Sequence, residues 1–189
     1  MTQTRCFWGW GYEDEGPDPL QLQAVEAALS HLLGSTSFER RPRPVLEGIH
    51  LRPPRVQCPS SLRGILSDAP HERALHSYGR SYRDLVRTTR GEFPNPPDQV
   101  ALPRTEQDVE RVIEECDHLG LAVIPFGGGS SVCGGVEPDP EGRHAGTVSL
   151  DLRHLDRVLE IDPVSRAARI QAGVLGPSLE DQLRPSGLT

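Results

Sequence analysis

The chain has 189 residues and a formal net charge of −7, and all 20 of its basic residues are arginine. An acidic chain lacks the positive face that nucleic acid requires, so we expect no nucleic-acid partner. Without lysine, neither a P-loop lysine nor a lysine Schiff base can form. No apolar run approaches the roughly 20 residues that span a bilayer, and the start of the chain does not resemble a signal peptide, so we expect a cytoplasmic protein.

Residues 1–94 are expected to form an irregular, partly helical N-terminal region. An arm rich in Gly, Trp, Tyr and acidic residues leads into residues 20–33, where apolar side chains recur at steps of three and four. This spacing predicts an amphipathic helix that ends at Gly34. The apolar positions are Leu22, Val25, Leu29 and Leu32.

The remainder of the N-terminal region has weaker patterns. Residues 35–70 hold six prolines, which predicts extended connections with at most a short helix. Residues 76–90 are expected to form a second helix, with Leu85 and Val86 facing inward. The proline-rich stretch that follows is the predicted boundary between this region and a domain that begins at residue 95.

Several titratable side chains were considered for a chemical role, and none is expected to have one. The cysteines form no CxxC pair and no zinc-like spacing with histidine, so we expect no metal site. Two histidines are interpreted as surface groups, and three arginines as a solvated helix face rather than a phosphate contact. These residues are Cys6, Cys58, Cys116, Cys133, His71, His76, Arg83, Arg87 and Arg90.

Residues 95–189 are expected to be the first and incomplete part of an α+β domain. Thr105 is a predicted N-cap with Asp108 completing an acidic capping box, and Gly120 ends the helix that they begin. Gly176 and the proline after it begin a final helix. Strands are expected at residues 99–102, 121–124 and 147–152, with a hairpin of residues 157–161 and 167–171.

A glycine-rich segment follows the predicted strand directly and comprises Pro125, Phe126, Gly127, Gly128, Gly129, Ser130 and Ser131. Three consecutive glycines let the backbone approach a ligand closely, and successive N–H groups can converge on an anion. No carboxylate occurs between His118 and Val136, so the segment is locally free of negative charge. These features predict a diphosphate-binding loop, with a flexible connection as the alternative explanation.

Two other phosphate-binding motifs do not fit this segment. A Walker loop needs a lysine, which the chain lacks. The dinucleotide fingerprint GxGxxG would place glycine at position 132, where Val132 stands. The segment therefore matches neither motif, and a plain flexible connection stays the alternative.

The segment and its flanks resemble the FAD-linked oxidases related to vanillyl-alcohol oxidase and p-cresol methylhydroxylase (PCMH). The likeness extends over PDQVALPRTEQDVERVIEECDHLGLAVIPFGGGSSV and TVSLDLRHLDRVLEIDPVSRAARIQAGVLGPSLEDQLRPSGL. The stretches WGWGYEDE and HSYGRSYRDLVRTTRGEFPNPPDQVALP resemble the alkyldihydroxyacetonephosphate synthase branch. The resemblance implies the N-terminal half of a vanillyl-alcohol-oxidase/PCMH-type FAD-binding domain.

The same resemblance implies FAD as cofactor, with residues 125–131 around its pyrophosphate. Ser130 and Ser131 stand where some covalent members have histidine, so noncovalent binding is expected. Asp151 and Leu152 would lie beside the site, without an expected contact to FAD. The family's catalytic residues lie in a substrate domain further along the chain, so no catalytic residue is predicted here.

The branch implies a flavin-dependent transferase of ether-lipid synthesis, which exchanges the acyl group of acyl-dihydroxyacetone phosphate for an alkyl group. Two alternatives remain open: an FAD-dependent oxidoreductase of a 2-hydroxy acid such as lactate or glycolate, and an inactive truncated product. Activity is expected of a full-length homodimer acting on a small molecule or a lipid, and not of residues 1–189 alone. A membrane contact would suit a lipid substrate, but no basic amphipathic helix supports it.

Overall fold

The computed structural model describes residues 4–34, 37–38, 41–139 and 142–189, and a four-stranded sheet lies at its centre. In spatial order the strands are β1 (Leu66–Ser67), β2 (Gln99–Ala101), β4 (Thr147–Asp151) and β3 (Ala122–Phe126). The last three run parallel, and β1 pairs antiparallel at the edge. The sheet therefore takes one strand from before residue 95, and the boundary there stays a prediction.

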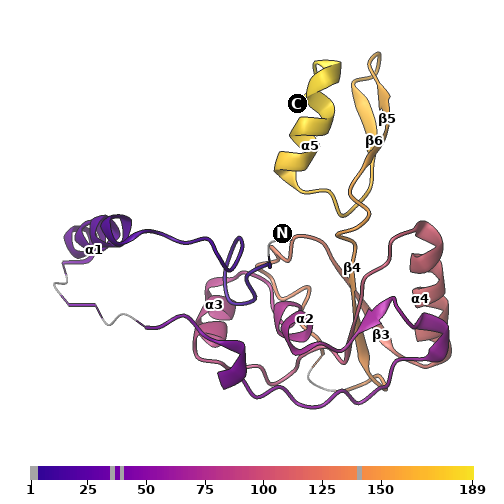
Figure 1. Cartoon of the computed structure of the whole chain (residues 1–189), viewed down its shortest axis with the longest axis horizontal. Helices are drawn as coiled ribbons and strands as arrows, with labels where there is room; N and C mark the ends of the chain where they lie inside the picture. Colours follow the sequence, from indigo (N-terminus) through magenta and orange to yellow (C-terminus); the bar gives the residue numbers. More distant parts are fainter. Residues whose placement is uncertain (1–3, 35–36, 39–40, 140–141) are drawn as a thin grey trace.

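Five α-helices and a hairpin surround or extend this sheet in the described part of the chain (Figure 1). The helices are α1 (Pro19–Leu33), α2 (Pro70–Leu75), α3 (Tyr82–Thr89), α4 (Glu106–His118) and α5 (Gly176–Leu183). The hairpin consists of β5 (Val158–Asp162) and β6 (Ala167–Ile170), and short 3-10 turns occupy Leu46–Gly48, Ser60–Leu62 and Arg184–Ser186. None of the helices in the described ranges is long and apolar enough to cross a membrane.

The apolar core lies between α4 and one face of the sheet. Val112 and Cys116 of α4 pack with Val148 and Leu150 of β4 in one buried cluster. The predicted capping box is confirmed, because the Thr105 hydroxyl accepts the Asp108 N–H at 3.1 Å while the Asp108 carboxylate accepts the Thr105 N–H. Alternation along β4 then directs its remaining side chains toward α2 on the opposite face.

The helix predicted over residues 76–90 is confirmed only in its second part. Residues 76–81 are not helical, and α3 begins at Tyr82. Gly79 packs closely against the loop that follows β3, since a Cβ on Gly79 would lie 2.0 Å from the Ser131 carbonyl oxygen. In α3 the buried residues are Asp84 and Thr88, whereas the predicted Leu85 and Val86 are half-buried.

The expectation that three arginines form a solvated face of this helix is wrong for Arg87. Arg87 donates to Glu137 at 2.7 Å and to Asp84 at 2.6 Å, and its guanidinium lies 4.0 Å from the Tyr78 ring centroid. Arg83 and Arg90 are exposed, as predicted. Arg87 therefore joins α3 to the segment after the glycine loop.

Helix α1 is confirmed over its predicted length and lies at the surface. It begins with a capping box at Asp18 and ends at Gly34 with φ 63°. None of its residues is buried, and Leu32 is 77% exposed. Figure 1 shows α1 set apart from the sheet. Local sequence therefore forms this helix without a core to support it.

The hairpin and final helix agree with the sequence. β5 and β6 pair antiparallel around a turn in which the Asp162 carboxylate accepts the N–H of Val164 at 2.9 Å. α5 carries its proline in the first turn and holds the hairpin through Gln182, whose side-chain oxygen accepts the Val158 N–H at 2.8 Å.

Candidate functional site

The carboxyl ends of β3 and β4 meet at one edge of the sheet. Phe126 pairs with Asp151 in this parallel register, so the glycine segment and the Asp151 carboxylate lie side by side. Ligands of open parallel sheets bind at this kind of edge. Pro125 and Phe126 occupy the last positions of β3, and Gly127 to Ser131 form the loop beyond it.

The loop conformation requires glycine at position 129. Gly129 has a φ of 69°, and a Cβ there would lie 2.4 Å from Cζ of Phe126. Phe126 is fully buried, with its ring centroid 4.1 Å from that of His76. The loop thus folds back over an aromatic ring and leaves no space for a side chain.

Four consecutive backbone N–H groups of the loop have no acceptor in the described part of the chain, although Gly129 itself is buried. Within the described residues, those of Gly127, Gly128, Gly129 and Ser130 donate to no protein acceptor. Consecutive unpaired N–H groups form an anion-binding surface. Two cavities of about 490 and 340 Å³ flank them, the first lined by Gly127 and the second by Gly128 and Ser130.

Ser131 holds the far end of the loop. Its hydroxyl oxygen accepts the Gly135 N–H at 3.1 Å, and its carbonyl oxygen accepts the Arg80 N–H at 2.7 Å. Ser130, by contrast, is exposed and lines a cavity. The two serines therefore differ: the Ser131 hydroxyl shapes the turn, whereas Ser130 is open to a ligand.

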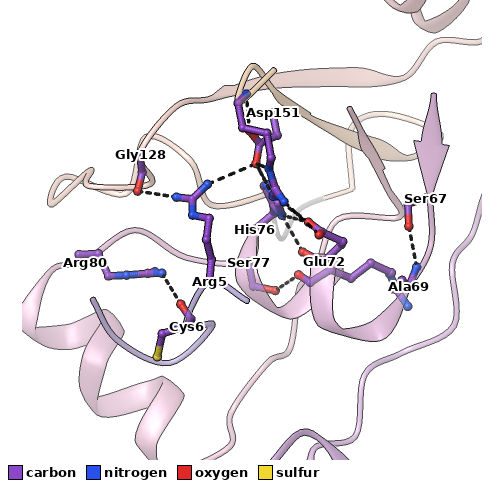
Figure 2. A network of polar contacts seen from close by, with 12 residues as sticks. Arg5, Cys6, Ser67, Ala69, Glu72, His76, Ser77, Arg80, Gly128 and Asp151 are labelled. Atoms are coloured by element: carbon purple, nitrogen blue, oxygen red, sulfur yellow. Dashed lines mark hydrogen bonds and ion pairs between the residues drawn. The ribbon is translucent and has the colours of Figure 1, made fainter. Parts of the chain in front are cut away.

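A largely buried ionic cluster lies beside the loop (Figure 2). Asp151 accepts hydrogen bonds from His76 at 2.8 Å and from the Arg153 guanidinium at 2.6 Å. Arg153 also donates to Glu72 at 2.9 Å, and Arg5 lies 3.5 Å from the Asp151 carboxylate. The side chains of Asp151 and His76 are both fully buried.

The interpretation of His76 as a surface group is wrong. Its Nδ1 lies 2.7 Å from the Glu72 carbonyl oxygen and its Nε2 lies 2.8 Å from Asp151 Oδ2. Both ring nitrogens therefore lie within hydrogen-bond distance of an acceptor oxygen. His71 is half-buried in α2, 3.1 Å from Glu13, and lines the larger cavity.

The partners of Asp151 stabilise its charged form. Burial raises the pKa of Asp151, but the hydrogen bonds from His76 and Arg153 outweigh it and lower the pKa to about 2. Burial lowers the pKa of Arg5 despite the nearby Asp151. Arginine nevertheless keeps its proton in proteins. The guanidinium groups of Arg5 and Arg153 thus face the carboxylates of Asp151 and Glu72 beside the loop.

Sequence patterns did not reveal the members of this cluster. Arg5 and Gly128 are 123 positions apart in the sequence, and His76 and Asp151 are 75 positions apart. No spacing rule connects such distant positions. The one local signal was the place of Asp151 at the end of a predicted strand beside the glycine loop. In the described ranges, no group of three or more His, Cys, Asp or Glu side chains is arranged to hold a metal ion.

This chain is similar in sequence and in fold to known proteins. Residues 97–189 match the model of a family described as an FAD-binding domain. The fold of the whole chain matches a solved alkyldihydroxyacetonephosphate synthase with a TM-score of 0.81 at 30% identity, covering 97% of this chain and 39% of that one. The expected α+β fold, part of a PCMH-type FAD-binding domain, is confirmed.

Two curated relatives extend this similarity. The chain is 36% identical over 160 residues to alkyldihydroxyacetonephosphate synthase of Dictyostelium discoideum, covering 80% of this chain. It is 40% identical over 162 residues to that of Trypanosoma brucei brucei, covering 79%. The chain spans about a quarter of the length of these relatives, 26% of each. A D-lactate dehydrogenase of Danio rerio is less similar, 30% identical over 154 residues, or 74% of this chain and 30% of that one.

Proposed function

We propose that the edge formed by β3, β4 and the glycine loop binds the pyrophosphate of FAD. The observation that supports this most strongly is the run of four N–H groups, from Gly127 to Ser130, that have no acceptor in the described residues, beside a cavity that Arg5 and Arg153 line. A diphosphate is an anion that accepts several hydrogen bonds at once, which suits both features. Residues 125–131 would form this site within a domain that begins at residue 95.

We further propose that FAD is held noncovalently at this loop. Ser130 and Ser131 occupy the positions that would bear a histidine linkage, and a serine hydroxyl is a weak nucleophile without an activating base. The nearby His76 has both ring nitrogens engaged in hydrogen bonds. When bound, the flavin would supply an electrophilic, electron-accepting centre, while the protein binds and orients it.

For the complete protein we propose the reaction of its relatives, exchange of acyl for alkyl on acyl-dihydroxyacetone phosphate in ether-lipid synthesis. The synthases match at higher identity than the D-lactate dehydrogenase does, which makes a 2-hydroxy-acid oxidoreductase the weaker candidate. A cytoplasmic location, a homodimeric assembly and a lipid-facing surface remain predictions.

The loop can be tested by titrating FAD and ADP into the full-length protein and into Gly129→Ala. We expect this variant to bind both ligands at least about ten-fold more weakly, because positive φ and the Phe126 ring exclude a methyl group. The matched control is Gly48→Ala, where the nearest atom to a new Cβ is 3.9 Å away. Equal affinities in all three proteins would contradict the proposed loop.

The reaction can be tested by an anaerobic visible spectrum of the full-length protein. Bleaching of the flavin band by acyl-dihydroxyacetone phosphate, and not by lactate or glycolate, is the expected result. Bleaching by a hydroxy acid alone would make the protein an oxidoreductase. A colourless protein that acquires no band with added FAD would contradict the cofactor itself.

A further inference from the structure

The first turn of the chain is a closed structure that holds Arg5 in place. Arg5 and Tyr12 form an antiparallel bridge, the Cys6 N–H donates to the Gly11 carbonyl at 2.9 Å, and the Glu13 N–H donates to the Thr4 carbonyl at 2.9 Å. This turn, residues 4–13, is called the arm turn below. Its backbone fixes the direction in which the Arg5 side chain leaves.

Arg80 joins the arm turn to the glycine loop. Its side chain is buried and donates through Nε to the Gly9 carbonyl at 2.8 Å and through Nη2 to the Cys6 carbonyl at 3.2 Å. Its backbone N–H donates to the Ser131 carbonyl at 2.7 Å. One residue therefore binds the arm turn with its side chain and the end of the loop with its backbone.

Arg5 makes a second connection between the arm turn and the glycine loop. Its Nη2 donates to the Gly128 carbonyl at 3.0 Å (Figure 2). Its guanidinium lies 5.7 Å from the centroid of the Phe126 ring. It also lines both cavities that flank the loop. The loop is thus held at two of its carbonyl groups, Gly128 by Arg5 and Ser131 by Arg80.

A hydrogen bond that fixes the direction of a backbone carbonyl group also fixes the direction of the N–H group of the next residue. In a trans peptide the C=O of one residue and the N–H of the next point in opposite directions within one plane. The bond from Arg5 to Gly128 therefore turns the Gly129 N–H away from the guanidinium. The bond from Arg80 to Ser131 does the same for the N–H of Val132. Both bonds set the loop before any ligand arrives, which reduces the cost of binding.

We propose that Arg5 is a positioning residue for the diphosphate loop: through the Gly128 carbonyl it sets the direction of the N–H groups that meet the anion. This inference rests on the proposed FAD function and extends it to the arm turn, whose sequence carries no phosphate-binding motif. The arm turn is then a functional part of the cofactor site.

The test compares three proteins in full-length form: the unmodified protein, Arg5→Gln and Arg5→Lys. Dissociation constants are measured for FAD, for ADP and for riboflavin, which lacks the diphosphate, together with the thermal unfolding midpoint. We expect Arg5→Gln to bind FAD and ADP about ten-fold more weakly, the effect of losing one charge-assisted hydrogen bond. Riboflavin affinity and the unfolding midpoint should change little.

Arg5→Lys separates positioning from a purely structural role. Lysine keeps the charge and carries its N–H donors on a single nitrogen, so it lacks the planar fork that reaches Gly128 and Asp151 together, and about a three-fold loss is expected. The matched control is Arg169→Gln, which removes the same charge from a side chain that is 71% exposed and should bind FAD and ADP as the unmodified protein does.

Each outcome has a distinct meaning. FAD and ADP affinities of Arg5→Gln within two-fold of the unmodified protein would overturn the role of Arg5 while leaving the FAD site intact. An equal loss for riboflavin would also overturn it, since the effect would then not act through the diphosphate. If the unmodified protein binds neither FAD nor ADP, the proposed function itself fails, and the inference fails with it.

Discussion

Two buried aspartates occupy opposite ends of the central strands, and they differ in what surrounds them. Asp98 precedes β2 and accepts hydrogen bonds from Arg52 at 2.6 Å, from Arg55 at 2.7 Å and from the Thr147 N–H at 2.8 Å. Asp151 ends β4 and binds groups from the arm turn, α2 and the turn after β4. Both have a lowered pKa, because these partners outweigh the burial that would raise it.

This contrast shows that burial and ion pairing do not by themselves mark a functional residue. Asp98 is enclosed by partners that belong to the sheet edge and its immediate connections. Asp151 stands at the carboxyl end of the parallel strands, and its partners Arg5 and Arg153 line a cavity. The position relative to the strand ends, where ligands bind such sheets, distinguishes the two.

The largest effect is expected for Asp98→Ala. Removing the carboxylate leaves the buried Thr147 N–H without an acceptor and two arginines without their partner, so the free energy of unfolding should fall by about 3 kcal/mol. Denaturant unfolding measures this. Asp181→Asn, at a surface pair whose Asp181 side chain is 68% exposed, should change it by less than about 0.5 kcal/mol. FAD affinity of the folded Asp98→Ala protein should be unchanged.

Asp151→Asn should have a smaller effect on stability but should also act on the site. The amide keeps the shape and loses the charge that holds His76 and Arg153, which should cost about 2 kcal/mol of unfolding free energy. FAD affinity should fall because the support of Arg5 weakens. A variant that loses stability yet binds FAD normally would place Asp151 in the same structural class as Asp98.

The pH dependence of stability offers an independent measure of Asp151. Its folded pKa of about 2 lies below its ordinary value of 3.8, so its contribution is present above about pH 4 and is lost as pH falls through 2. Between pH 6 and pH 2 the unmodified protein should lose about 2 kcal/mol more unfolding free energy than Asp151→Asn. If the unfolding free energies of the two proteins fell equally between pH 6 and pH 2, the folded state would not lower the pKa of the Asp151 carboxylate.

The smallest effect is expected for Arg153→Gln. Asp151 keeps His76 and Arg5 as partners in this variant, and the Arg153 side chain is one-quarter exposed, so a loss of about 1 kcal/mol is expected. Arg184→Gln removes an equal charge from a side chain that is 74% exposed and should lose less than about 0.5 kcal/mol. Indistinguishable unfolding curves for the two variants would show that the cluster contributes as little as a surface pair.

The sequence by itself determined the elements whose hydrogen bonds are local. The capping box of Thr105 with Asp108 and the turn at Asp162 join atoms within four residues, so short patterns predict them. The glycine loop belongs to the same class, since its backbone freedom is a property of consecutive residues. Its assignment to an FAD-binding family agreed with the relatives because that signature is also contiguous.

Only the tertiary structure decided which side chains surround the loop and what the helices pack against. The apolar pattern of α1 predicted a helix correctly, but burial requires a second surface, and none of its residues is buried. Gly79 packs against Ser131, a contact that no local rule contains. His76 and Arg5 became part of the site only when parallel pairing brought the ends of β3 and β4 together beneath the arm turn. Such contacts depend on the path of the whole chain, which is why residue spacing could not predict them.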